Sequence, residues 1–450
     1  MYYKTLITNV MVVFGDKPNK RHDVLISGNF IARIENPNTI DPKMCNIVDG
    51  THLYLFPGII SSQVHFREPG LTHKGNIYSE SRAAVAGGVT SFMEMPNVNP
   101  STTTYDLLEQ KYAIAKNNSL ANYSFFMGVT NDNYKEVMKF DARNVCGAKI
   151  FAGSSTGNML VDNINSIEKV MRGRQDCIIS MHCENDKIIA GNKERLIKEI
   201  GAGNLRPYHH PTIRNVEACY DSSSTMVKLA EETGARLHVL HISTAKEISL
   251  FRNDIPLEQK RVTAEACVHH LCFSDFDYAE LGNLIVCNPA IKTVGDCQAV
   301  WNAVLNNFID VVDFDHAPHT WDEKMETYLK APSGIPLIQH GFNLMLEKYH
   351  QREISLQSIV KKMCNNQAIL FNIEERGFIR EGYFADLVLV DINNSHIVTK
   401  ENILYKCGWS PFEGKKFNSV ITDTFVNGHR AYSNGKLNDI KLGKRLLFKR

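Results

Sequence analysis

Short apolar runs rich in β-branched residues recur along the middle of the chain, and several are followed by stretches with helical periodicity. Two such stretches are TTTYDLLEQKYAIAKN and SSSTMVKLAEETGA. Strands that alternate with amphipathic helices are typical of parallel βα units. The apolar runs lie at residues 54–66, 87–95, 122–129, 147–153, 177–184, 236–243, 262–270 and 309–315. Eight such units predict an α/β fold with a (β/α)₈ barrel, the TIM barrel.

The two ends of the chain have shorter strand patterns and clear turn signals. They read DVLISGNFIARI near the start, and GFIREGYFADLVLVD and SVITDTFVNGHRAYSNGKL near the finish. SGN and VNGH are typical of hairpins. Neither end has enough strands for an independent sheet, so we predict that both build one smaller composite β-sandwich domain. The expected parts of this domain are residues 1–54 and 375–450, with the barrel at 55–374.

Polar residues that are unusual in buried strands stand at the carboxyl end of six of the apolar runs. Parallel barrel strands direct these ends to one face, which carries the chemistry in barrels of this kind. We therefore expect one shared opening for His65, Asn97, Lys149, His182, His241 and Asp315.

Each of these residues also has a simpler explanation when it is taken alone. His182 or His241 would serve as a hydrogen-bonded core histidine, DHAPH at 315–319 as a polar loop, and Lys149 as a salt-bridged lysine. Their convergence favours a metal centre, since neutral imidazoles and a carboxylate bind borderline cations such as Zn²⁺. Two neighbouring cations would generate hydroxide near neutral pH. Lys149 becomes a ligand only if its charge is removed, as carbamylation by CO₂ would do.

Composition restricts the class of protein and its partners. The 450 residues are 43% hydrophobic and 22% charged, which suits a large folded protein with an ample core. The net charge is +1 without a basic stripe, which argues against nucleic acid. The start has no signal-peptide pattern and no run approaches the roughly 20 apolar residues of a membrane span, so we expect a cytoplasmic protein. Eleven scattered cysteines without a CxxC pair indicate reduced thiols.

A set of motifs spread over nearly the whole chain resembles the class I dihydroorotases of the amidohydrolase superfamily. The motifs are PGII…VHFREPG, GGVTSFMEMPN, GAKIFAGSSTGNML, HCE, LHVLHIST, AEACVHHL, CNPAIK, DHAPH and CGWSPFEG. The resemblance implies a barrel with a composite β-domain, one or two Zn²⁺ ions per chain, and an enzyme that hydrolyses cyclic amides. The implied reaction is the reversible conversion of L-dihydroorotate to N-carbamoyl-L-aspartate in de novo pyrimidine (UMP) synthesis.

The resemblance also implies roles for individual residues. Metal-bound hydroxide would attack the ring amide, with Asp315 as general base and then general acid. An arginine fork suits the substrate carboxylate, so Arg67 would hold it. The metal ligands would be His65, Lys149, His182, His241 and Asp315, and the other substrate contacts would be Asn97, Asn288 and His319.

The sequence departs from this family at several positions around the expected site. Relatives read Asp-x-His-x-His-x-Arg where this chain has SSQVHFR, so Gln63 replaces an imidazole and Ser61 replaces an acid. Gln63 offers only a neutral and harder oxygen donor to the metal. Phe314 stands where a small hydroxylic residue usually precedes the aspartate, and Gln367 replaces a proline.

Two other functions therefore stay open. The first is a non-catalytic homologue with a structural role, such as a partner of aspartate carbamoyltransferase. The presence of the expected metal ligands and carboxylate-binding residues argues against it. The second is a related cyclic-amide hydrolase of the allantoinase or dihydropyrimidinase type, against which Arg67 speaks. The expected partner is a small-molecule substrate, with no membrane, and a homo-oligomer is left open. GSSTGNML and residues 331–336 are candidate pocket walls.

Overall fold

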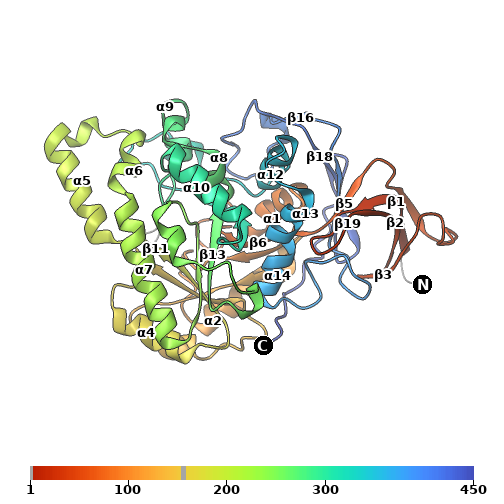
Figure 1. Ribbon diagram of the computed structural model, residues 1–450, viewed down its shortest axis with the longest axis horizontal. Helices are drawn as coiled ribbons and strands as arrows, with labels where there is room; N and C mark the ends of the chain where they lie inside the picture. The colour runs from red at the N-terminus through yellow and green to blue at the C-terminus, as the bar shows by residue number, and fades with distance from the viewer. Residues whose placement is uncertain (1–3, 154–158) are drawn as a thin grey trace.

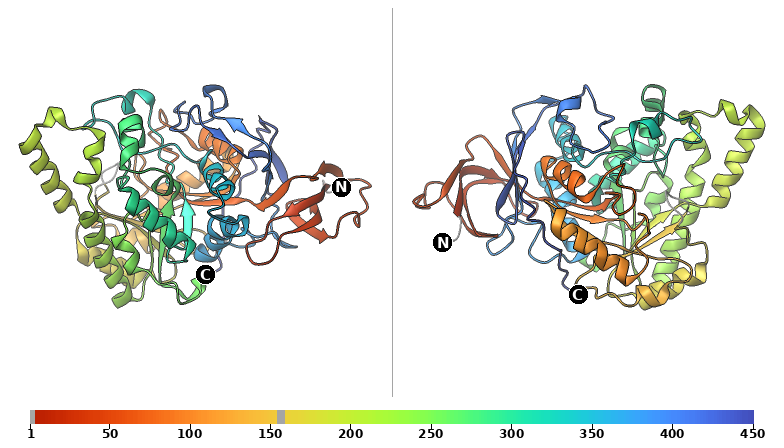
Figure 2. Two further views of the ribbon diagram at one scale, coloured as in Figure 1. Left: turned by 45° about the horizontal axis from the view of Figure 1, so that its top comes forward. Right: turned by 180° about the vertical axis from the view of Figure 1, so that it is seen from behind.

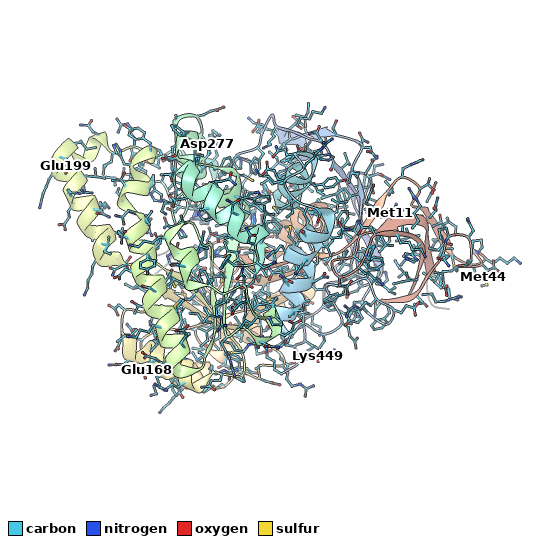
Figure 3. All side chains as sticks on the ribbon, in the orientation of Figure 1. Met11, Met44, Glu168, Glu199, Asp277 and Lys449 are labelled. Atoms are coloured by element: carbon cyan, nitrogen blue, oxygen red, sulfur yellow. The ribbon has the colours of Figure 1, made fainter. Side chains whose placement is uncertain are left out.

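The structure, a computed structural model, describes residues 4–153 and 159–450. A helix-covered barrel forms one end of an elongated molecule, and a β-sheet that contains the N-terminal strands forms the other (Figures 1 and 2). Met44 in the sheet domain and Glu199 in the barrel domain mark these two ends (Figure 3). None of the described helices is long and apolar enough to cross a membrane.

The barrel is built from two parallel sheets that meet at both edges. One holds β6 (Ile59–Val64), β7 (Val89–Glu94) and β8 (Asn122–Phe125); the other holds β9 (Met127–Gly128), β10 (Gly147–Ala152), β11 (Ile178–Cys183), β12 (Arg236–Val239), β13 (Val262–Cys267) and β14 (Val311–Asp313). The amide of His65 donates to the carbonyl of His316 at 2.7 Å, which joins β6 to the end of β14. At the other edge the chain runs directly from β8 into β9 through Phe126, whose amide donates to the carbonyl of Glu94 in β7 at 3.0 Å. The predicted TIM barrel is confirmed, with the third predicted strand broken into β8 and β9.

Helices cover the barrel strands, whose side chains are buried almost without exception. Both helical predictions hold: Thr104 caps α2 by accepting from the amide of Leu107, and α7 ends at Gly234, whose φ of 72° suits glycine. The helices are α1 (Ile77–Ala86), α2 (Tyr105–Asn118), α3 (Tyr134–Val137), α4 (Ile164–Gly173), α5 (Asp186–Ile200), α6 (His210–Ile213), α7 (Val216–Thr233), α8 (Val268–Cys272), α9 (Tyr278–Leu281), α10 (Val294–Leu305), α11 (Trp321–Lys324), α12 (Gly341–His350), α13 (Leu356–Val360) and α14 (Asn366–Phe371).

Strands from both chain ends form one nine-stranded sheet beside the barrel. Its order is β20-β19-β18-β15-β5-β1-β2-β3, with β4 paired to β1. The two ends meet where β5 runs antiparallel to β15, with Leu55 opposite Leu389. The strands are β1 (Lys4–Val12), β2 (Lys20–Ser27), β3 (Phe30–Glu35), β4 (Asn46–Asp49), β5 (Tyr54–Pro57), β15 (Leu387–Asp391), β18 (Val420–Val426), β19 (His429–Ser433) and β20 (Lys436–Leu437), while β16 (His396–Ile397) and β17 (Lys416–Phe417) pair separately.

The first predicted barrel strand, residues 54–66, is shared between the two domains. The amide of Gly58 donates to Asp386 of the sheet domain at 2.7 Å, and the next amide, of Ile59, donates to Gly88 of the barrel at 3.1 Å. A Cβ on Gly58 would lie 2.1 Å from the Thr90 hydroxyl, so the crossing requires glycine. The chain thus changes sheets at 57/58 rather than 54/55. Both halves of the run are buried, so hydrophobicity alone could not place the crossing.

The last residues of the chain leave the sheet domain and return to the barrel. The amide of Leu446 donates to Tyr123 at 2.9 Å, and the amide of Phe448 donates to Arg143 at 3.0 Å. The Arg450 guanidinium donates to the carbonyl oxygens of Cys146 at 2.8 Å and Phe371 at 3.1 Å. This segment, which we expected within the sheet domain, covers the amino ends of the barrel strands.

Candidate active site

The five expected metal ligands come from five different barrel strands. Lys149 lies within β10 and His182 within β11, while His65, His241 and Asp315 stand within two residues of the ends of β6, β12 and β14. All five side chains are buried, and none is more than 9% exposed.

These ligands form two contact pairs. His65 Nε2 lies 3.1 Å from Asp315 Oδ1, and His182 Nδ1 lies 3.0 Å from His241 Nε2. The charge of Lys149 acts on both Asp315 and His241, so Lys149 lies near both pairs. Burial lowers the pKa of Lys149 to about 7. A large share of this amine is therefore neutral near physiological pH, which is the form that reacts with CO₂.

The contacts of His65 test whether a cation fits this end of the site. Its Nδ1 lies 2.7 Å from Asn97 Oδ1, so both ring nitrogens face acceptor oxygens. A neutral imidazole carries only one N–H, and burial lowers the pKa of His65. Burial alone would raise the pKa of Asp315, but contact with His65 lowers it to about 2. One N–H cannot satisfy both oxygens, and a cation between Nε2 and the carboxylate would; the residues present fit a metal ion.

Three of the expected site residues have a left-handed backbone. Their φ angles are 72° for Arg67, 40° for His241 and 46° for Asp315. Such angles are strained for residues with a side chain, and strain of this kind gathers at functional sites. Buried carboxyl groups hold two of them: Glu94 Oε1 accepts from the Arg67 amide at 3.0 Å, and Glu265 Oε1 accepts from the His241 amide at 3.3 Å.

Arg67 is a buried cation whose outer nitrogen faces His319. Its Nε donates to the carbonyl of Pro318 at 3.1 Å, and burial lowers its pKa to about 10, so it stays charged at neutral pH. Lys74 donates to His319 Nδ1 at 3.0 Å, which leaves the ring proton on Nε2, 3.0 Å from the Ser333 carbonyl. Arg67 NH2, 3.1 Å from this protonated nitrogen, therefore has no acceptor there. Its hydrogens suit an incoming carboxylate.

The substituted positions on β6 are tied into the barrel interior. Cys267 directs its thiol to Gln63 Oε1 at 3.6 Å, and Ser61 donates to Asp313 Oδ1 at 2.5 Å. The acid beside Ser61 thus comes from β14. Gln367 also donates to Asp313, at 2.9 Å. Burial raises the pKa values of Asp313 and Glu265 to about 8, so both hold protons at neutral pH.

The remaining expected residues have contacts of their own. Asn288 Oδ1 lies 3.1 Å from His210 Nε2, a contact that the sequence did not suggest. Phe314 packs against Gly341 of α12, away from the ligands. Of the candidate pocket walls, residues 331–336 contact His319 through Ser333, while residues 154–158 of GSSTGNML lie outside the described residues.

Sequence reasoning missed several charged groups that support the site. Glu184 Oε2 lies 3.1 Å from His182 Nε2 and pairs with Arg214. Burial would raise the pKa of Glu184, but Arg214 and His182 lower it to about 2. Glu80 accepts from His316 Nε2 at 2.9 Å. Of these two acids only Glu184 could be found from the sequence, because it belongs to the HCE motif. The contact between Glu80 and His316 joins distant parts of the chain, which the sequence does not reveal.

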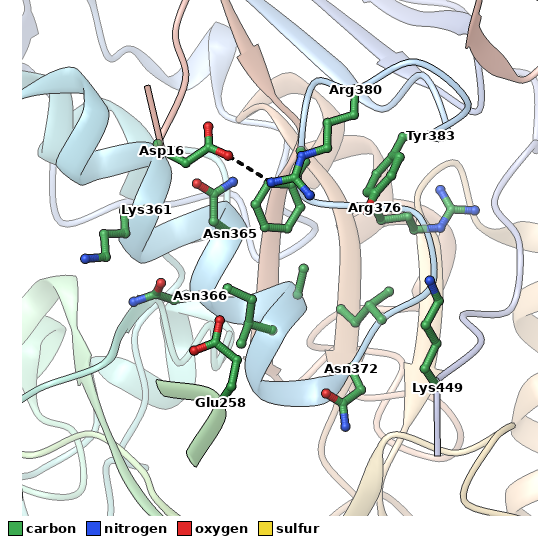
Figure 4. Close-up of a pocket in the computed structure, with 15 residues that line it drawn as sticks. Asp16, Glu258, Lys361, Asn365, Asn366, Asn372, Arg376, Arg380, Tyr383 and Lys449 are labelled. Carbon is green, nitrogen blue, oxygen red and sulfur yellow. Dashed lines mark hydrogen bonds and ion pairs between the residues drawn. The ribbon is translucent and has the colours of Figure 1, made fainter. Parts of the chain in front are cut away.

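Two cavities lie near opposite ends of the barrel strands. A cavity of about 550 Å³ is lined by Asp16, Lys361, Asn366, Arg376 and Arg380, among others (Figure 4). Asn366 donates to the carbonyl of Asp310, which precedes β14, so this cavity opens at the amino end of that strand. A second cavity of about 310 Å³, lined by Ala152 and Glu184, lies at the carboxyl ends of β10 and β11. The second is therefore the one on the side of the chemistry.

This architecture, a TIM barrel with its polar residues at the carboxyl ends and a β-domain from both chain ends, is also found in known proteins. The profile of the Amidohydrolase family matches residues 54–431, so the chain belongs to this family. It is 32% identical to a dihydroorotase from Halobacterium salinarum over 80% of this chain and 82% of that one. It is 29% identical to an allantoinase from Desulfitobacterium hafniense over 99% of each chain.

Solved structures agree on the fold. L-hydantoinase (dihydropyrimidinase) from Arthrobacter aurescens superposes with a TM-score of 0.91 at 22% identity, covering 99% of this chain and 100% of that one. Dihydropyrimidinase from Brevibacillus agri NCHU1002 gives a TM-score of 0.88 with the same identity and coverage. These likenesses establish the barrel and its β-rich domain.

Proposed function

We propose that this protein is a zinc-dependent dihydroorotase that interconverts L-dihydroorotate and N-carbamoyl-L-aspartate in pyrimidine synthesis. The observation that carries the proposal is the buried Arg67, whose NH2 group faces a protonated nitrogen of His319 and lacks an acceptor there. Dihydroorotate has a carboxylate on its ring that this guanidinium would bind. The dihydroorotase relative, at 32% identity, supports the same substrate.

The metal would be held by His65, Asp315, His182 and His241, with Lys149 as a carbamylated bridge. Bound zinc polarises a carbonyl and lowers the pKa of water. Asn97 holds the His65 ring through Nδ1 and so directs Nε2 to Asp315. Strand burial around these side chains excludes bulk water, which strengthens their electrostatic effect on a developing oxyanion.

Asp315 is the proton carrier in this proposal. Its pKa of about 2 keeps it ionised at neutral pH, ready to take a proton from the attacking water. The same carboxyl then protonates the leaving amide nitrogen, so that the C–N bond breaks as the ureido group forms. The reverse direction uses the same atoms to close the ring.

Substrate orientation follows from residues around the same opening. Arg67 would bind the carboxylate, with Asn97 and His319 beside it, and Asn288 would contact the ring amide. Lys74 contacts His319 and lies 3.0 Å from Glu323, so a network of charges fixes the His319 ring.

Allantoinase is the second candidate, because allantoinase relatives match 96–99% of this chain at 28–29% identity. The ring of allantoin carries no carboxylate, so this activity leaves the buried charge of Arg67 without a partner. A scaffold without catalysis, the third reading, leaves unexplained the three strained residues at the strand ends.

The test is turnover of dihydroorotate, allantoin and hydantoin by zinc-supplemented protein, beside the variants Arg67→Gln and Arg67→Lys. We expect dihydroorotate hydrolysis in the unmodified protein. Arg67→Gln should raise KM for dihydroorotate by roughly 10–100-fold, the equivalent of a charge-assisted hydrogen bond, with zinc content unchanged. Arg67→Lys keeps the charge but not the two parallel donors of the guanidinium. Its KM for dihydroorotate should lie between those of the unmodified protein and Arg67→Gln.

Other outcomes would decide against dihydroorotase. Turnover of allantoin alone would favour the second candidate. Protein that binds zinc but hydrolyses none of the three rings would favour a scaffold.

A further inference from the structure

A second cluster of metal-binding side chains lies next to the expected ligands. It consists of His269 and His270 on α8 and Cys287 in the loop that carries Asn288. One ligand atom from each residue lies within 4.8 Å of the others, and all three side chains are buried. Within residues 4–153 and 159–450 this is the only such group of three among histidine, cysteine, aspartate and glutamate.

Three of the four ring nitrogens in this cluster have no hydrogen-bond partner in the described part of the chain. They are both nitrogens of His269 and Nδ1 of His270, and Nδ1 of the neighbouring His241 shares this state. The Phe314 carbonyl is near enough to raise the pKa of His269 against the larger effect of burial, but it lies outside hydrogen-bond geometry. A buried polar group without a partner costs about 1–3 kcal/mol, so several together require an explanation.

The tautomer of His270 shows which kind of partner is missing. Its Nε2 lies 3.0 Å from the Pro289 carbonyl and must donate to it, so Nδ1 carries a lone pair. Burial lowers the pKa of His269 to about 4 and that of His270 well below its usual value. Both rings are therefore neutral near pH 7 and present lone pairs, as a metal ligand must.

The simpler alternative is a pair of core histidines that pack against each other, with ring centroids 4.1 Å apart and ring planes tilted by 48°. Such packing covers the rings but does not satisfy their in-plane lone pairs. The thiol of Cys287 also points along its own loop, 3.3 Å from the Pro289 carbonyl, and does not donate to either ring. Packing thus accounts for the burial of the three residues and leaves their donor atoms unexplained.

We propose that His269, His270 and Cys287 bind a thiophilic divalent cation, with zinc as the natural candidate, at a site separate from the His65–Asp315 and His182–His241 pairs. Two imidazoles and a thiolate are a donor set that zinc prefers. Zn–N and Zn–S bonds of about 2.0 and 2.3 Å bring ligands in tetrahedral sites about 3.5 Å apart, so the three donors must close in by about 1 Å. A fourth position is left for solvent.

Binding includes one proton transfer. The Cys287 S–H bond breaks, the proton passes to solvent, and the sulfur lone pair forms the metal–sulfur bond. Burial raises the pKa of Cys287, and a bound cation reverses that preference. Metal binding at this site therefore tightens as pH rises. The ion would tie α8 to the loop that carries Asn288, next to the opening of the barrel.

The first test uses the unmodified protein loaded with Zn²⁺, examined by X-ray absorption at the zinc edge. None of the five expected ligands of the active site contains sulfur, so a sulfur neighbour reports a different site. We expect one sulfur neighbour on part of the bound zinc. A zinc environment of nitrogen and oxygen alone at saturation would overturn the proposal.

The second test loads the protein with Co²⁺ and measures the near-ultraviolet thiolate-to-cobalt absorption band. We expect the band in the unmodified protein. Cys287→Ser should lose the band and should bind one ion fewer per chain. Cys267→Ser is the matched control, because that thiol lies 3.6 Å from both Gln63 Oε1 and Glu265 Oε1 and should leave the band intact. A band lost in the control but kept in Cys287→Ser would place the site elsewhere and overturn the proposal.

Two further variants separate this proposal from the proposed function. Asp315→Asn should stop hydrolysis and keep the band, while His269→Gln should remove the band. The loss of the band in a variant counts only if its circular dichroism matches that of the unmodified protein. If His269→Gln and Cys287→Ser both fail to fold, the zinc-edge measurement on the unmodified protein decides the question alone.

Discussion

The two sides of the barrel opening differ in how far the protein itself satisfies their polar groups. On the β6–β14 side, His65, Arg67 and His319 each contact named partners, and the substituted Ser61 and Gln63 are tied to Asp313 and Cys267. On the β12–β13 side, nitrogens of His241, His269 and His270 have none in the described part of the chain. The first side holds its side chains through contacts with other residues, although Arg67 NH2 and the His65–Asp315 pair still suit a ligand. The second side has ring nitrogens without any partner in the described part of the chain.

This difference concerns position 63, where this chain has glutamine in place of the imidazole that the resemblance leads one to expect. The groups around Ser61 and Gln63 are amides and neutral acids, because burial keeps Asp313 and Glu265 protonated. The ring nitrogens of His241, His269 and His270 that have no partner in the described part of the chain lie on the β12–β13 side. We expect metal affinity to depend mainly on the β11–β13 ligands and substrate affinity mainly on the β6–β14 residues.

The largest expected effect comes from Asp315→Asn on the β6–β14 side. The amide cannot accept the proton, so kcat for dihydroorotate should fall by roughly 10²–10⁴-fold. Steady-state kinetics at saturating zinc measure it. The exposed Asp106→Asn on α2 is the control and should change kcat less than about twofold. Full activity in Asp315→Asn would remove this residue from proton transfer.

The next effect comes from Gln63→His, which restores the missing imidazole. A partner that only orients a ligand is worth about 10–100-fold in metal affinity, so a direct ligand should tighten zinc binding at least about 10-fold. Competition with a chelator measures the change. Gln63→Leu has a similar size without a donor and should give no gain. Equal affinities in all three proteins would show that no metal lies within reach of position 63.

The smallest effect concerns Glu265→Gln, where the two sides meet. The folded pKa of Glu265 is raised from 4.5 to about 8, so the folded state keeps a proton that the unfolded state loses between these values. Stability of the unmodified protein should therefore fall as pH rises through this window. Asp313 also has a raised pKa, so Glu265→Gln should reduce the fall and not abolish it.

Urea unfolding of metal-free protein at several pH values between 5 and about 8 measures this slope. Glu258→Gln, at an exposed position, should leave the slope unchanged. A stability that rises with pH in the unmodified protein would contradict the assigned protonation.

The sequence predicted those features that depend on neighbouring residues. His65, His182, His241 and Asp315 each stand at the end of an apolar run, and strand direction alone brings such ends to one face. The supporting acids were not predictable in this way, because the contact between Ser61 and Asp313 spans 252 positions. The crossing at Gly58 was hidden because strands of both sheets are equally apolar.

The second cluster shows the same limit. The run 262–270 was predicted as one strand, whereas β13 ends at Cys267 and α8 begins at Val268. Two adjacent histidines at that turn were the available signal. Cys287 joins them only through the path of a loop that carries no periodic pattern.

The left-handed backbones of Arg67, His241 and Asp315 imply a trade-off between durability and chemistry. Glycine would relax each position by about 1–2 kcal/mol of conformational strain, at the loss of its side chain. A chain with only a structural role would gain stability from glycine at all three positions. The presence of side chains at these three positions in spite of the strain is what one expects if they take part in a reaction.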